Sequence, residues 1–166
     1  MTIRYRAGDL RTFAYNLLCK KGMQTDPAGT VANVLLEGDL LGHTTHGLQL
    51  LAPYLSELDE GKMTPEGNPE IVQDHGMTVL LMMIDPEALG GRKRFVEETS
   101  WIAKACLDGE PIDSDNPVRL PGQSALAKKR RYLKEGVELE PGILPALEKW
   151  SAALDVAVPE PLNPEK

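Results

Sequence analysis

The sequence predicts a mainly α-helical protein with one or two residual strands. Segments with apolar residues at helical spacing recur along the 166 residues, and most of them end at a glycine. Only the run MTVLLMMID at 77–85 has the continuous apolar character of a strand covered on both faces. A lone strand has no partner of its own, and two-stranded sheets are marginally stable. We therefore expect this strand to be orphaned from a larger sheet, or to pair with segment 70–73 or with another subunit.

Two helices are expected near the N-terminus. The first covers residues 9–21, with Asp9 as its N-cap and Gly22 directly after its last turn. The second begins in TDPAG, where Asp26 is the expected N-cap, and it ends at Gly42.

A third helix is expected over about 47–60, and Pro53 inside it should kink the helix or delay its regular start. Gly38 lies inside the second helix, where glycine costs about 1 kcal/mol relative to alanine. We expect a close approach of another chain segment to require it.

Three further helices are expected in the second half of the chain. They cover 92–108, the segment from Ser124 to Gly136, and about 143–155, and a proline-rich linker at 110–123 joins the first two. The inward face of the helix 92–108 is expected to hold Phe95, Ile102, Ala103, Cys106 and Leu107.

One helical domain is expected over 1–158, followed by a disordered tail at 159–166. The apolar fraction of 42% suits a packed core.

Charge and composition exclude several classes of protein. A formal charge of −7 argues against a nucleic-acid binder and against an electrostatic membrane anchor. The basic run KKRRYLK at 128–134 is expected to be the solvated face of a helix. No apolar run is long enough to span a bilayer, and the N-terminus has no secretory signal pattern. Cys19 and Cys106 are expected to be small buried residues in a reducing compartment, so the predicted location is the cytoplasm.

The stretch GDLLGHTTHGLQLL at 38–51 contains two of the three histidines. His43 and His46 are three residues apart and could share a face, and His75 could join them in a metal site. Nothing in the sequence fixes that geometry and no cysteine is nearby, so we expect no metal. The alternatives for His46 are a proton donor in an active site and a polar residue at a helix junction.

Two segments resemble one enzyme family in the correct order. The first is LLEGDLLGHTTHGLQLLAPYLSELDEGKM, which contains an acidic-Leu-x-Gly run leading into a hydroxyl-His-Gly triplet. The second includes IDPEALGG, then NPVRLPGQ, and the run from KKRRYLKEG to the last helix. They resemble the N- and C-terminal segments of the type 2 malate/L-lactate dehydrogenase family, over about residues 8–155. The resemblance implies a helical domain built from the family's two ends, 1–76 and 77–158.

The family's long central region is missing from this chain. That region carries most of the sheet, the main nicotinamide-cofactor contacts and further active-site side chains. Here the N-terminal segment runs directly into the C-terminal one, and we place the deletion junction near 78–82. A glycine-rich phosphate loop is also absent from the sequence, so no replacement cofactor site is visible.

The resemblance implies a role for His46, and two nearby residues could support it. The family histidine that matches His46 exchanges a proton with the substrate oxygen, while hydride moves to or from NAD or NADP. Thr45 stands where the family has serine and keeps the hydroxyl, and Asp39 could orient His46. Two residues depart from the family pattern. Leu50 stands where many members have an arginine suited to binding a substrate carboxylate, and Gln123 replaces the glutamate of a Leu-Pro-Gly-Glu motif.

The predicted function is therefore that of an internally deleted oxidoreductase of 2-hydroxy and 2-keto acids or cyclic imino acids, inactive as an isolated chain, with His46 idle. The alternative is an assembly module, because family members are dimers. The chain would then form a homodimer or pair with an intact relative.

Overall fold

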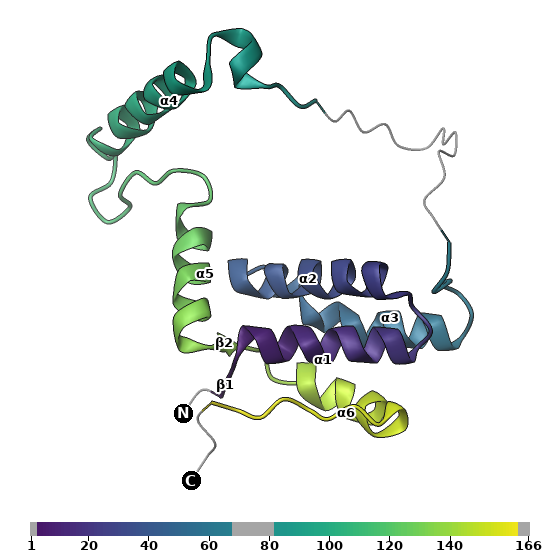
Figure 1. Cartoon of the computed structure of the whole chain (residues 1–166). Coiled ribbons are helices and arrows are strands. Elements are labelled where there is room, and N and C mark those ends of the chain that lie inside the picture. The colour runs from purple at the N-terminus through teal and green to yellow at the C-terminus, as the bar shows by residue number, and fades with distance from the viewer. Residues whose placement is uncertain (1–2, 68–81, 163–166) are drawn as a thin grey trace. The chain divides into compact units, whose positions relative to one another are not determined.

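The computed structural model describes residues 3–67 and 82–162 (Figure 1). The chain divides into two compact units, one comprising residues 1–68 and 124–166 and the other residues 69–123. Within the described ranges there are six α-helices and a single two-stranded sheet, which confirms the mainly α-helical prediction. Among the same residues, no helix is both long and apolar enough to cross a membrane.

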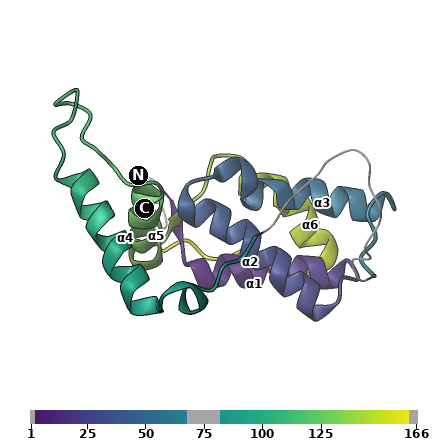
Figure 2. The ribbon, with the colours of Figure 1, turned by 90° about the horizontal axis from the view of Figure 1, so that it is seen from above.

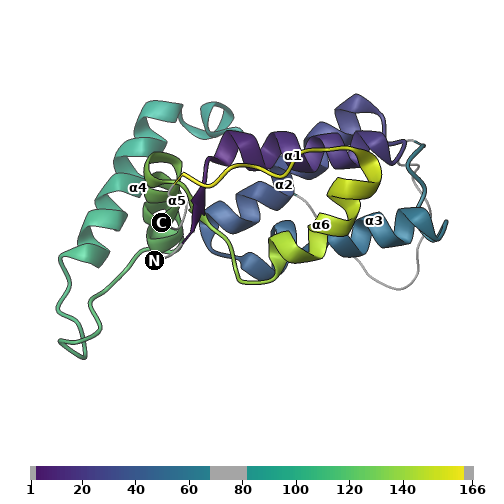
Figure 3. The ribbon, with the colours of Figure 1, turned by 90° about the horizontal axis from the view of Figure 1, so that it is seen from below.

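The larger unit is a cluster of helices around a leucine-rich core. Its helices are α1 (Ala7–Lys20), α2 (Thr25–Leu41), α3 (Leu51–Asp59), α5 (Gln123–Glu135) and α6 (Ile143–Leu154). Helix α1 packs along α2, and α6 lies against both α1 and α3, as Figures 2 and 3 show from opposite sides. The most deeply buried apolar side chains come from several of these elements: Leu10, Leu17, Leu18, Leu48, Leu51, Leu55, Val137 and Leu147.

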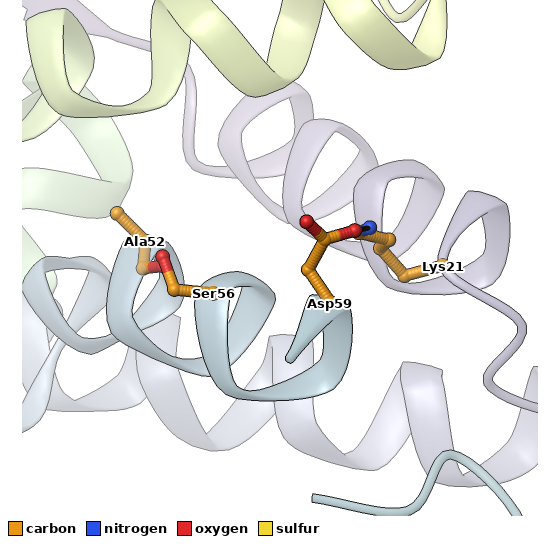
Figure 4. A network of polar contacts seen from close by, with 4 residues as sticks. All are labelled: Lys21, Ala52, Ser56 and Asp59. Carbon is orange, nitrogen blue, oxygen red and sulfur yellow. Dashed lines mark hydrogen bonds and ion pairs between the residues drawn. The ribbon is translucent and has the colours of Figure 1, made fainter. Parts of the chain in front are cut away.

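Polar contacts join the ends of three helices in this unit. The Lys21 ammonium, just after α1, forms an ion pair with Asp59 at the end of α3 (Figure 4). Within α3, the Ser56 hydroxyl donates to the Ala52 carbonyl oxygen at 3.1 Å. The same ammonium lies 4.9 Å from the ring centroid of Trp150 in α6. A cation over an indole face is stabilising, so Lys21 links α1 to both α3 and α6.

A short sheet connects the N-terminus to the segment after α5. Strand β1 (Arg4–Tyr5) pairs antiparallel with β2 (Val137–Glu138), with Arg4 opposite Glu138. The Leu162 N–H donates to the Arg4 carbonyl oxygen at 2.7 Å, so a residue of the segment expected to be a disordered tail contacts β1.

The helix starts differ from the expected ones. Helix α1 begins at Ala7, and Asp9 lies in its first turn and not at its N-cap. Helix α2 begins at Thr25, so Asp26 is also a first-turn residue. Both predicted N-caps are therefore wrong. Each acidic side chain still lies where the helix dipole favours negative charge, and these helices begin on extended backbone with no side-chain cap.

The end of α2 and the start of α3 follow the predictions. Gly42 ends α2 in the left-handed conformation, with φ of 86°. Two 3₁₀ turns, η1 (Thr44–His46) and η2 (Leu48–Leu50), precede α3. Pro53 lies in the first turn of α3, where its missing N–H costs little. The regular helix is thus delayed relative to residue 47.

The smaller unit contains η3 (Pro86–Leu89) and α4 (Arg92–Leu107). The Asp85 carboxylate caps η3 by accepting a hydrogen bond from the Glu87 N–H at 3.0 Å. The face of α4 that was expected to point inward is exposed: Phe95 is 53% and Ile102 is 54% exposed. Helix α4 contacts η3, which is too short to cover that face. This part of the predicted core is therefore wrong.

Two smaller predictions also need correction. Cys19 is only half-buried and Cys106 is exposed, and both are free thiols. Residues 77–81 of the predicted strand, together with segment 70–73 and His75, lie outside the described residues. Residues 82–85 have no regular secondary structure, and Met82 and Met83 are exposed.

Candidate active site

The turn that carries His46 folds back onto helix α2. The His43 N–H donates to the Gly38 carbonyl oxygen at 2.8 Å, and the His46 N–H donates to the His43 carbonyl oxygen, also at 2.8 Å. A Cβ atom at Gly38 would lie only 2.6 Å from the His46 carbonyl oxygen. The structure thus confirms that a close approach requires glycine at position 38, and the approaching segment is the His46 turn.

Asp39 holds the same turn from inside the protein. Its side chain is buried, with 1% of the residue exposed. Its Oδ2 atom accepts a hydrogen bond from the Leu48 N–H at 2.7 Å, and its Oδ1 atom has no hydrogen-bond partner among the described residues. A Cβ atom at Gly47 would lie 2.3 Å from Asp39 Oδ1, so a larger residue at position 47 would collide with the carboxylate.

Burial raises the pKa of Asp39 to about 6. The Leu48 N–H and the Lys128 ammonium oppose this rise, because both stabilise the carboxylate, whereas Glu140 adds to the rise by repulsion. The carboxyl group therefore titrates closer to neutral pH than an ordinary aspartate does.

His46 faces an open groove. Thr45 Oγ1 lies 3.0 Å from His46 Nδ1. If Nδ1–H donates to the hydroxyl oxygen, Nε2 carries no proton and can accept one from a ligand. If the hydroxyl donates to Nδ1, the ring proton is on Nε2, which can then only donate. The groove has a volume of about 470 Å³ and is lined by Val34, Glu37, Gly38, His43 and His46. An exposed imidazole beside a groove of this size could exchange a proton with a small molecule.

Comparison with known proteins places this turn inside a recognised segment. Residues 5–81 match the family model described as malate/L-lactate dehydrogenase. A protein from Cupriavidus necator named L-lactate dehydrogenase is 35% identical over 75 residues, which make up 45% of this chain and 21% of that protein. The chain thus spans about a fifth of the length of the curated relative that it matches.

The matched segment, residues 5–81, holds all three residues predicted for the site. The structure brings Asp39, Thr45 and His46 together around one turn, through the Thr45–His46 contact and the Asp39–Leu48 hydrogen bond. His43 also lines the groove, and Leu50 is half-buried. Within the described ranges, no three side chains of the His, Cys, Asp or Glu type lie close enough together to bind a metal ion.

Two lysines of α5 belong to the surroundings of this turn, which sequence reasoning missed. The Lys129 ammonium pairs with the Glu37 carboxylate at 2.5 Å. A Cβ atom at Gly42 would lie 2.8 Å from Lys128 Nζ, and the same ammonium lies 5.3 Å from the Tyr132 ring centroid. Both lysines are half-buried, so the basic run at 128–134 is not simply a solvated face. The amphipathic pattern indicated a helix but could not indicate that α5 packs near the end of α2.

The groove does not fit a nicotinamide dinucleotide. Proteins bind the pyrophosphate of such cofactors with cationic side chains or with backbone N–H groups at a helix start. The residues that line the groove include no lysine or arginine, and the one carboxylate among them, that of Glu37, already holds the nearby Lys129 ammonium in an ion pair. Helix α2 ends near the groove, and the C-terminal end of a helix disfavours anions. The groove therefore offers an imidazole beside open space, and its described lining offers no cationic side chain for a pyrophosphate.

Proposed function

We propose that this chain derives from NAD(P)-dependent oxidoreductases of 2-hydroxy and 2-keto acids, and that His46 stands at the proton-transfer position. The observation that supports this proposal is the turn at 43–48. It lies in the segment that matches the malate/L-lactate dehydrogenase family, and a buried carboxylate and two glycine contacts fix it beside a groove. Fixed geometry is what a proton-transfer group needs, because its partner must lie within hydrogen-bond reach.

The chemistry of such a reaction divides into two transfers. A 2-hydroxy acid becomes a 2-keto acid when its hydroxyl proton and the hydride on the same carbon both leave. We assign acceptance of the proton to Nε2 of His46, in the tautomer in which Nδ1–H donates to the Thr45 hydroxyl oxygen. The hydride needs an acceptor of the NAD or NADP type, for which the groove provides no site. We therefore propose that the isolated chain does not catalyse the reaction.

We also propose that the family's central region is deleted between the two halves of this chain. The family match ends at residue 81, and the predicted junction lies near 78–82. The proposed setting of the protein is the cytoplasm, where the free thiols of Cys19 and Cys106 would stay reduced.

Two experiments test this function. The purified chain should show no oxidation of NADH or NADPH with pyruvate or oxaloacetate above background, and no binding of either dinucleotide by fluorescence titration. Turnover that depends on His46 would contradict the proposed inactivity.

The lineage is tested by transferring residues 5–81 into the Cupriavidus necator L-lactate dehydrogenase in place of its matching segment. We expect the hybrid to retain measurable dehydrogenase activity, and His46→Ala to reduce it at least about 100-fold, the range for loss of a general acid or base. A His43→Ala hybrid is the matched control on the same turn. An active hybrid that is unaffected by His46→Ala would refute the assignment.

A second candidate function is self-association through α4. The helix exposes an apolar stripe formed by Phe95, Ile102 and Cys106, which are seven and four residues apart and so share one face. Such a face suits a helix partner and not solvent. We propose a second copy of this chain as that partner, in an antiparallel arrangement. Arg92 and Arg94 at the start of α4 would then face Asp108 and Glu110 at the end of the other copy. Sedimentation that shows a monomer at high protein concentration would contradict this candidate.

A further inference from the structure

Asp39 contacts the turn that carries His46 at the two residues that follow the histidine. Its carboxylate bonds the Leu48 N–H, and its two oxygens occupy the space that a side chain at Gly47 would fill. The backbone of α2 at Gly38 also approaches the His46 carbonyl group. Residues 46–48 are therefore held by contacts with both the backbone and a side chain of α2.

Holding a backbone segment with a buried carboxylate costs free energy. A buried charge is destabilising unless it is paired and fully hydrogen-bonded, and Oδ1 of Asp39 has no hydrogen-bond partner among the described residues. An asparagine could accept the same hydrogen bond from Leu48 without the cost of burying a charge. Packing and the hydrogen bond to Leu48 therefore do not explain why residue 39 is an aspartate and not an asparagine.

We propose that Asp39 is a positioning residue for His46, whose ionised carboxylate fixes the backbone at Gly47 and Leu48 and so keeps the imidazole over the groove. This inference rests on the proposed function only in its assumption that the His46 imidazole transfers a proton. A charged acceptor forms a shorter and stronger hydrogen bond than a neutral one, so ionised Asp39 holds the turn more tightly than its protonated form.

Four groups near Asp39 can influence its protonation. Lys128 of α5 favours the carboxylate, Glu140 in the segment after β2 opposes it, and His43 and His46 are the titratable groups of the turn itself. Burial keeps the pKa of Asp39 near 6. On acidification through this range, the bond to Leu48 should weaken and the turn should become more mobile.

The test follows two signals by NMR, the Leu48 amide proton and the His46 ring protons, from pH 4 to pH 8. In the unchanged chain the Leu48 amide should shift with a midpoint that reports Asp39. In Asp39→Asn this transition should be lost, and the pH titration of the His46 ring protons should change as well. Asp26→Asn, an exposed position near the start of the same helix, is the matched control and should leave both signals unchanged.

Hydrogen exchange separates positioning from folding. Asp39→Ala should speed exchange of the Leu48 amide about tenfold, the loss expected for one hydrogen bond, and should leave the Leu17 amide in the core of α1 protected. If Asp39→Ala does not fold, the comparison of Asp39→Asn with the unchanged chain still decides the proposal. A His46 ring titration that is the same in both would overturn it.

These readouts do not depend on dehydrogenase activity. A changed His46 signal in Asp39→Asn, together with a hybrid enzyme indifferent to His46→Ala, would support the positioning role and refute the proposed function. The opposite pair of results would refute positioning and leave the proposed function intact.

Discussion

Gly29 and Gly38 lie in the same helix but have different surroundings. A Cβ atom at Gly29 would meet nothing within 4 Å, whereas one at Gly38 would lie 2.6 Å from the His46 carbonyl oxygen. Gly29→Ala should therefore stabilise the protein by up to about 1 kcal/mol, the difference in helix propensity. Gly38→Ala should destabilise it despite the same propensity gain, because the turn must move. Urea unfolding of both variants measures this, and equal gains at both positions would contradict the close approach.

The titration of Asp39 predicts a pH dependence of stability with a definite sign. The pKa of this carboxyl is about 6 in the folded protein and near 3.8 in an unfolded chain, so the folded state binds the proton more tightly. Its contribution to stability is fully present below the unfolded value and is lost as pH rises through about 6.

Asp39→Asn removes this dependence. The stability of the variant relative to the unchanged chain should rise between about pH 4 and pH 7, by on the order of 2–3 kcal/mol. Urea unfolding at several pH values gives this difference, with Asp26→Asn as the control. A relative stability that is flat over this range would show that Asp39 does not titrate as a buried acid.

Some of the site could be predicted from single residues and some could not. The sequence around Thr45, His46 and Gly47 indicates a junction between two helices. The glycine at position 38, inside a helix, indicates that another chain segment approaches α2 closely there. The influence of Lys128 on Asp39 depends on α5, which is nearly ninety residues away in the sequence. Local spacing carries no information about such a contact.

At the scale of the elements, α4 shows why an amphipathic pattern predicts a helix better than it predicts a buried face. The pattern of Phe95, Ile102 and Cys106 gave the helix correctly, with bounds within one residue of those expected. Burial of its stripe requires a second element, which the pattern does not specify. The N-terminal bounds of α1 and α2 were displaced for another reason, since backbone geometry and not a side chain begins both helices.

If α4 mediates self-association, substitutions on its apolar stripe should weaken a dimer and substitutions on another side of the helix should not. Ile102 lies on the stripe with Phe95, one heptad away, whereas Trp101 points to another side of the helix and is also exposed. Ile102→Glu should dissociate a dimer because it places a charge in the seam, and Trp101→Glu should not. Sedimentation equilibrium of both variants measures this. Equal effects of the two changes would contradict a defined interface.

At the scale of the whole molecule, the two units differ in how they are stabilised. The buried apolar residues of the described part belong to the larger unit, and α4 contains no buried residue. Local opening is least costly where few apolar contacts are lost. The sequence did not predict this division, because helical periodicity alone gives every amphipathic helix the same expected share of one core.

The division predicts two classes of hydrogen exchange. Amides in α1, α2 and α6 should be protected to the level of global unfolding, and amides in α4 should exchange much faster. If a second copy covers α4, protection of the α4 amides should increase with protein concentration, because association follows mass action. Protection of the α1 amides should not change. Exchange followed by mass spectrometry at low and high concentration tests both statements. Rapid exchange in α4 at every concentration would reject self-association, and protection of α4 equal to that of α1 in the dilute sample would reject separate stabilisation of the units.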